Sequence, residues 1–111
     1  MLTRGFILLL VVVAGQVHSA RADFAVLGVG ADSCASWTKN SKNPFMNQAQ
    51  LLWVEGFLSG LAQGTRRDLL KNVDQEAIDR WMSSYCAQHP LDRVFDAMAP
   101  LWLDLLKRQN P

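Results

Sequence analysis

The two cysteines, Cys34 and Cys86, constrain the fold of this 111-residue chain more than any other feature. In an oxidising compartment an even count in a short chain indicates a disulfide, and two cysteines allow only one intramolecular pairing. That bond would close a loop of about 52 residues and contribute roughly 4 kcal/mol, comparable with the net stability of a small domain. We therefore expect Cys34 and Cys86 to form a disulfide that the fold requires. A reactive thiol is the alternative, but the chain has no Cys-x-x-Cys motif.

The N-terminus predicts export. Arg4 precedes an unbroken apolar run over residues 6–14, and the small residues Ala20 and Ala22 follow it. This order is typical of a secretory signal peptide, and the run is much shorter than the ~20 apolar residues of a membrane span. We expect residues 1–22 to be removed near Ala22. Residues 17–19 are an alternative cleavage site, and an uncleaved anchor is a second alternative.

After that cleavage, residues 23–111 would form a single periplasmic or secreted domain with no transmembrane segment. This part of the chain carries nine Lys and Arg residues and ten Asp and Glu residues. Such a balance excludes a strongly basic nucleic-acid binder, and the high apolar content excludes a disordered charged tail. We therefore expect a small globular protein that binds no nucleic acid.

Helical periodicity predicts an all-α fold, beginning with two helices. Residues 23–30 show no clear period and are expected to form an extended leader. Asp32 or Ser33 can cap a short helix that reaches about residue 42. Pro44 marks the break before a longer helix over residues 45–63, which Gly64 would end as a C-terminal cap. One side of this helix is apolar: Trp53, Val54, Phe57, Leu58 and Leu61.

Two further helices complete the predicted bundle, after a polar connection over residues 65–73. Asp74 or Asn72 would cap the third helix, whose apolar face holds Ile78, Trp81, Met82 and Tyr85 at i, i+3, i+4 and i+7. His89 and Pro90 end it, and Pro90 suits the first turn of the last helix. That helix would bend at Pro100 on its polar side. It would carry an apolar face of Leu91, Val94, Phe95, Met98, Leu101, Trp102, Leu105 and Leu106. The prediction is a four-helix bundle stapled by Cys34–Cys86.

Three stretches of the chain carry a family resemblance. They are residues 33–37 (Ser-Cys-Ala-Ser-Trp), residues 53–60 (Trp-Val-Glu-Gly-Phe-Leu-Ser-Gly) and residues 81–91 (Trp-Met-Ser-Ser-Tyr-Cys-Ala-Gln-His-Pro-Leu). Together they resemble a group of small exported bacterial helical proteins. This group includes the HdeA-like acid-stress chaperones and the Rap/Tai-type immunity proteins that protect against type VI secretion toxins. The resemblance implies a helical scaffold that acts by binding a toxin or an unfolded client.

The second helix also carries the candidate binding residues. Gly56, Ser59, Gly60 and Gln63 lie opposite its apolar side, where exposed backbone could accept a side chain of a partner. Leu52 and Trp53 would be the apolar anchors beside this groove. Tight packing of the two glycines inside the bundle is the alternative.

A small basic patch follows this helix. Arg66 and Arg67, with Lys71, would contact a partner or form a phosphate or anionic-lipid site, and a solvated loop is the alternative.

No pattern of catalytic or metal-binding residues is evident. Glu55 has no spaced acidic partner, and His89 is the only histidine after residue 22. We therefore expect a non-catalytic protein without metal or cofactor. Its function would be the binding of a toxin, an envelope protein or an unfolded client, and a homodimer is left open. The alternative function is acid-stress chaperoning, because strong acid would protonate all ten carboxylates.

Overall fold

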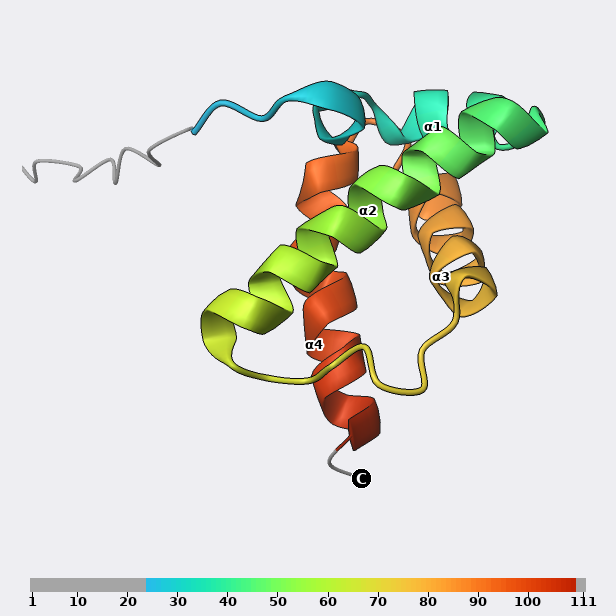
Figure 1. The fold of residues 1–111 in the computed structure, drawn as a ribbon. Coiled ribbons are helices and arrows are strands. Elements are labelled where there is room, and N and C mark those ends of the chain that lie inside the picture. The colour runs from blue at the N-terminus through green and yellow to red at the C-terminus, as the bar shows by residue number, and fades with distance from the viewer. Residues whose placement is uncertain (1–23, 110–111) are drawn as a thin grey trace, which may run out of the picture.

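The computed structural model describes residues 24–109 and contains four α-helices in this range (Figure 1). They are α1 (Cys34–Asn40), α2 (Pro44–Thr65), α3 (Gln75–Gln88) and α4 (Met98–Gln109). Two short 3-10 helices, η1 (Gly28–Ala31) and η2 (Val94–Ala97), precede α1 and α4. The predicted all-α bundle is confirmed. The predicted signal peptide, residues 1–22, lies outside the described residues, as does Asp23.

The long helix α2 crosses in front of α4, and α3 lies beside them, with α1 at the upper end of the molecule (Figure 1). The core is apolar and draws on all four helices. Its fully buried members include Trp37 of α1, Val54 and Leu58 of α2, Met82 of α3, and Met98 and Leu101 of α4. The helices are therefore held together mainly by burial of these side chains.

The predicted disulfide between Cys34 and Cys86 is present, with a Cα–Cα distance of 4.6 Å and both side chains fully buried. Backbone hydrogen bonds reinforce the connection. The Cys34 N–H donates to the Asp92 carbonyl at 2.7 Å, and the Val94 N–H donates to the Asp32 carbonyl at 2.9 Å. The start of α1 is thus fastened both to the end of α3 and to the segment that leads into α4.

Side-chain caps fix the starts of three helices. The Ser33 hydroxyl accepts from the Ser36 N–H, and the Asp74 carboxylate accepts from the Ala77 N–H. Of the two candidates predicted at each start, Ser33 and not Asp32 caps α1, and Asp74 and not Asn72 caps α3. Asn43 caps α2, and Pro44 occupies the first position, where its missing N–H breaks no helical bond.

The end of α2 was predicted wrongly. Gly64 lies inside the helix, which continues to Thr65. Arg66 takes the left-handed conformation at φ 55°, and its N–H donates to the Ala62 and Gln63 carbonyls. These hydrogen bonds satisfy the last carbonyls of α2, which a glycine was expected to do. The first helix also ends earlier than predicted, at Asn40.

The start of the last helix was also predicted wrongly. Leu91 is 95% exposed and belongs to a turn, and α4 begins only at Met98, after η2. Pro100 is the third residue of α4, so its missing N–H falls in the first turn, where no intrahelical partner exists. The proline therefore marks the beginning of this helix and does not bend its middle.

Two predicted irregular segments contribute to packing. Within the expected extended leader, η1 lies against α2. Leu69, in the connection expected to be polar, is only 2% exposed and joins the core. A single leucine inside a loop has no periodicity, so the pattern could not assign it to the core.

Candidate functional site

The side of α2 that points away from the core is exposed along the whole helix. We call it the outward face and define it by Phe45, Ala49, Leu52, Gly56, Ser59, Gly60 and Gln63. None of these residues is charged. The only charged residue within α2, Glu55, lies half-buried at the edge of this face. Solvent-facing sides of helices usually carry charges, so an uncharged outward face is unusual for a helix that packs on one side only.

The two glycines of this face have no packing role among the described residues. A Cβ atom placed on Gly56 or Gly60 would meet nothing within 4 Å. The alternative prediction, tight packing of these glycines inside the bundle, is therefore wrong. Each glycine in a helix interior costs about 1 kcal/mol relative to alanine, and no contact within residues 24–109 offsets that cost.

Two large apolar side chains stand on the first half of the outward face. Phe45 is 82% exposed and Leu52 is 57% exposed. They are seven residues apart, which places them on the same side two turns apart. Leu52 was predicted as an anchor. Phe45 was missed, although the Asn-Pro start of α2 would have placed it in the first turn and the seven-residue spacing would have aligned it with Leu52.

Trp53 lies elsewhere, which corrects its predicted position as an anchor beside the groove. It is half-buried under η1: its indole Nε1 donates to the Leu27 carbonyl at 2.9 Å. A Cβ on Gly30 would lie 2.0 Å from Cζ2 of the indole, so glycine is needed there for the close approach. Trp53 thus holds the N-terminal segment against α2. Of the four tryptophans, only Trp37 is fully buried.

The predicted basic residues stand at the far end of α2. Arg66 and Arg67 are exposed directly after the helix, and Lys71 is exposed further along the same loop. The outward face therefore runs from apolar side chains at Phe45 and Leu52, through bare backbone at the glycines, to two arginines.

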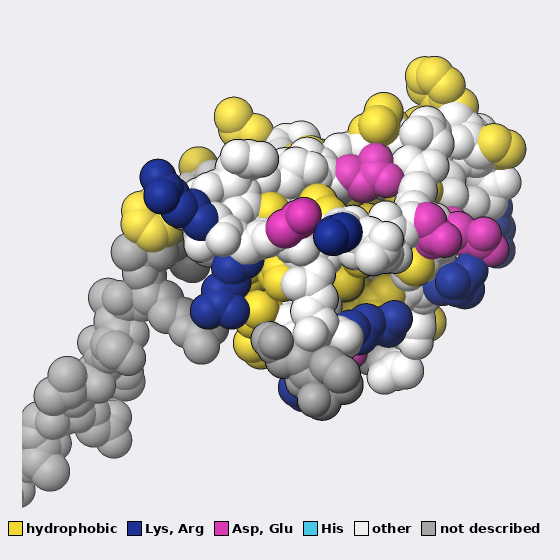
Figure 2. All heavy atoms as spheres, turned by 60° about the horizontal axis from the view of Figure 1, so that its bottom comes forward, with side chains coloured by type: hydrophobic (Ala, Val, Ile, Leu, Met, Phe, Trp, Pro, Cys, Tyr) yellow, Lys and Arg dark blue, Asp and Glu magenta, His cyan; other side chains and the backbone are white. Residues whose placement is uncertain are grey.

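A cleft of about 510 Å³ lies on another part of the molecule, between the 68–73 loop, the first turns of α3 and the last turns of α4. The sequence did not predict it. Leu69, Val73, Ile78, Trp81, Leu101 and Leu105 provide its apolar lining. Figure 2 brings this end of the molecule forward and shows apolar side chains in the hollow, with both basic and acidic side chains around them.

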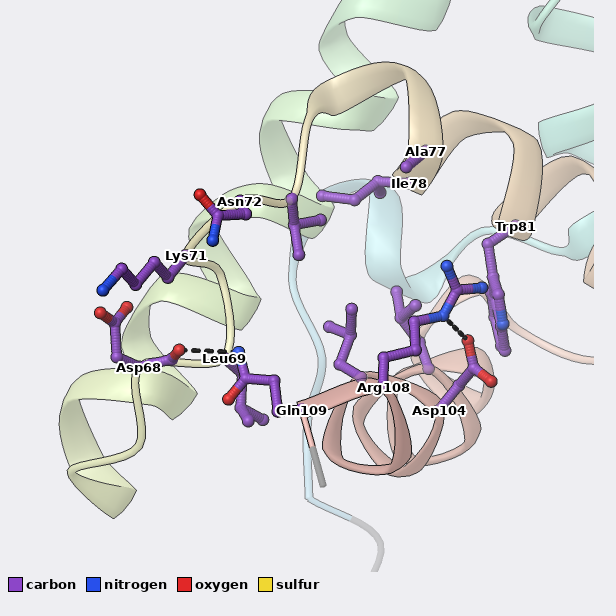
Figure 3. A pocket seen from close by; sticks show the side chains of 13 residues that line it. Asp68, Leu69, Lys71, Asn72, Ala77, Ile78, Trp81, Asp104, Arg108 and Gln109 are labelled. Carbon is purple, nitrogen blue, oxygen red and sulfur yellow. Dashed lines mark hydrogen bonds and ion pairs between the residues drawn. The ribbon is translucent and has the colours of Figure 1, made fainter. Parts of the chain in front are cut away.

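Polar residues form the edge of this cleft (Figure 3). The Arg108 Nε donates to an Asp104 carboxylate oxygen at 2.9 Å, and the Gln109 side-chain amide donates to the Asp68 carbonyl at 2.9 Å. Asn72, also at the edge, has a left-handed backbone with φ 63°. These contacts attach the end of α4 to the loop and keep the Arg108 side chain over the hollow.

A second, more open hollow of about 660 Å³ lies where α2, α3, η2 and α4 meet. Tyr85 lines it and donates a hydrogen bond of 2.6 Å to Asp92. Burial, and then the hydrogen bond to Asp92, raise the pKa of Tyr85 to about 12. Nearby, the hydrogen bond from Arg93 lowers the pKa of Asp96, whose carboxylate also accepts from the Arg93 backbone N–H. Both groups act in the structure through hydrogen bonds that fix the turn between α3 and α4.

Within residues 24–109, no three His, Cys, Asp or Glu side chains lie close enough together to hold a metal ion. No helix in this range combines the length and the apolar character needed to cross a membrane. No family model matches the chain, and neither a curated protein nor a solved structure matches it.

Proposed function

We propose that this chain is an exported, non-catalytic protein-binding module whose outward face on α2 contacts the partner. The partner would be a toxin, which an immunity-type protein blocks by covering its surface, or another protein of the cell envelope. The Cys34–Cys86 disulfide supports a periplasmic or secreted location, because such bonds persist in oxidising compartments.

The observation that carries this proposal is the outward face itself. The outward face carries no charged residue, which is unusual for an exposed helix face. Here Phe45 and Leu52 are exposed, and Gly56 and Gly60 reduce helix stability without a packing benefit in the described chain. A partner side chain seated on the bare backbone between these residues would explain both features.

The test is affinity capture from an envelope extract, followed by binding measurements with the purified partner. Leu52→Glu places a charge on the outward face. Leu103→Glu is its matched control, since Leu103 on α4 has an exposure of 56% against 57% for Leu52. We expect Leu52→Glu to weaken binding at least tenfold, and Leu103→Glu to leave it unchanged. Equal binding by both variants, or the absence of any partner, would contradict the proposal. A concentration-dependent mass that Leu52→Glu abolishes would identify the partner as a second copy.

A second candidate function, acid-stress chaperoning, is favoured by the structural use of carboxylates. Asp74 caps α3, Asp92 accepts from Tyr85, and Asp96 accepts from Arg93. Protonation of Asp96, whose pKa is lowered by the hydrogen bond from Arg93, would weaken the turn before α4 and expose apolar surface while the disulfide keeps the chain compact. The test is suppression of client aggregation at pH ~2–3. A chain that remains native there and fails to suppress aggregation does not act in this way.

A further inference from the structure

We propose that the partner contributes an α-helix to the outward face, and that this helix has an uncharged contact side and acidic residues at both of its ends. This inference rests on the proposed function, because it names the kind of partner surface that the same face would bind. The spacing of the outward face indicates the helical form, and the charges at the two ends of α2 indicate the acidic ends.

The residues of the outward face repeat as in the contact seam of a coiled coil. At successive intervals of four, three, four, three and four residues, α2 carries the exposed residues Phe45, Ala49, Leu52, Gly56, Ser59 and Gln63. Such a repeat keeps a line of side chains on one side of a helix and is the pattern against which a second helix packs. The 22 residues of α2 extend about 33 Å, which is long enough for a partner helix of about six turns.

The size of the side chains changes along this line. Phe45 and Leu52 project from the first half, whereas Gly56 and Gly60 leave bare backbone in the second half. A partner helix would therefore place small residues against Phe45 and Leu52, and large apolar residues against the two glycines.

Cations without an ion-pair partner lie at both ends of α2. Lys39 and Lys42 precede the helix, and Arg66 and Arg67 follow it directly. All four residues are exposed, and none of them forms an ion pair within residues 24–109. A partner helix with acidic residues at both ends would complement these charges while its middle covers the uncharged outward face.

The acidic residues near α2 do not neutralise its ends. Glu55 lies in the middle of the helix, at least about 16 Å along the axis from the cations at either end. Asp79 of α3 accepts a hydrogen bond from Asn47, on the packed side of α2. Asp68 is matched in number by Lys71, whose ammonium lies beside it (Figure 3). The ends of α2 therefore keep a net positive charge.

A second copy of the chain would fit the outward face in size but not in charge. In an antiparallel pair, Leu52 of each copy would meet Gly56 of the other. The same pairing would place Lys42 against Arg66 and bring the two Glu55 side chains together near the middle. In a parallel pair, each end of α2 would meet the same end of the other copy. Both arrangements oppose like charges, which selects a different chain with acidic ends.

Two synthetic helical peptides, each as long as α2, test this proposal by isothermal titration calorimetry. Both carry leucine at the seam positions of one half and alanine at those of the other half. One has glutamates in its first and last turns, and the other has lysines there. We expect the acidic peptide to bind the chain after residue 22 at least about tenfold more tightly at low ionic strength. In about 1 M salt, where the screening length is about 3 Å, this difference should fall below about threefold.

Variants of the chain locate the contact. Lys42→Glu and Arg67→Glu should each weaken binding of the acidic peptide about fivefold, and Leu52→Glu should abolish it. Arg80→Glu is the matched charge control and should bind the peptide at full strength, because Arg80 is exposed on α3 and not on the outward face. All four residues are exposed, so these changes leave the core intact.

Three results with the peptides would overturn the proposal. They are equal binding of the two peptides, the absence of binding by either, and full affinity of Lys42→Glu and Arg67→Glu for the acidic peptide. Self-association that Leu52→Glu abolishes would also overturn it, because the occupant would then be a second copy. Binding to phosphatidylglycerol vesicles in place of the peptide would identify a membrane surface as the occupant, with the same consequence.

A failure of this proposal can be told apart from a failure of the proposed function. A partner captured from an envelope extract is bound through the outward face if Leu52→Glu weakens the complex. If Lys42→Glu and Arg67→Glu then bind that partner at full strength, the outward face is the binding surface but the acidic ends are refuted.

Discussion

Replacing Gly56 and Gly60 of α2 by alanine should stabilise the fold. A Cβ at either position meets nothing within 4 Å, so the substitution introduces no clash. Alanine removes backbone freedom from the unfolded chain and is the best helix former. The gain should be about 1 kcal/mol at each position and about 2 kcal/mol for Gly56→Ala/Gly60→Ala.

Urea unfolding with the disulfide intact measures this gain. For a domain of this size the double variant should raise the midpoint by roughly 1–2 M urea, with an unchanged slope. The melting temperature should rise by roughly 8–16 °C. The same variant should bind the partner of the outward face more weakly, because two methyl groups would cover the bare backbone.

Gly30→Ala provides the opposite control on the same chain. Its Cβ would lie 2.0 Å from the Trp53 ring, so the indole or η1 must move, at a cost of roughly 1–3 kcal/mol. If Gly56→Ala/Gly60→Ala lowers the urea midpoint, the two glycines are packed against something, and the description of the outward face as open is refuted.

Three further predictions concern groups fixed by the fold. Tyr85 is the only tyrosine, so ultraviolet titration should show a single phenol with a pKa of about 12, and stability should fall as pH rises from 10 through 12; a midpoint near 10 would contradict its burial. The pKa of Asp96 is lowered in the folded state, so its contribution is present above the unfolded value of about 3.9 and is lost as pH falls below it. Asp96→Asn should therefore flatten the acid limb of the urea midpoint against pH, and an unchanged limb would count against this role. Cys34→Ser/Cys86→Ser should lose roughly 4 kcal/mol. Unaltered thermal stability of that variant under oxidising conditions would show that the disulfide is dispensable.

The parts of the fold that the sequence predicted correctly rest on strong local signals. Ser33 and Asp74 are good cap residues, Pro44 breaks the chain before α2, and the i, i+3, i+4 spacing in α3 matches a single packed face. The disulfide followed from the even cysteine count together with the expected export to an oxidising compartment.

The errors lie where tertiary contacts decide. Leu91 fits the apolar spacing of the last helix, yet it is exposed, because the backbone of residues 90–94 is hydrogen-bonded to the start of α1 and cannot be helical. Leu69 enters the core from a loop that carries no period.

The candidate sites were only partly predictable. Sequence placed Gly56 and Gly60 opposite the apolar side of α2, but could not say whether another element covers them. Trp53 was predicted to be an anchor, but in the structure η1 covers it. The cleft forms where the 68–73 loop contacts the end of α4, and these two segments are about forty residues apart in the sequence. A local sequence pattern cannot predict a contact between segments so far apart.

The disulfide joins two helix hairpins that otherwise share one peptide connection. Cys34 belongs to the α1–α2 half and Cys86 to the α3–α4 half, and the exposed loop after α2 is the only backbone between them. A trypsin-like protease that nicks this loop after Arg66 or Arg67 would leave both halves in one covalent molecule. The nicked protein would separate into fragments only on reduction, so the sulfur bridge keeps the two halves together after a cut at the exposed Arg66 or Arg67.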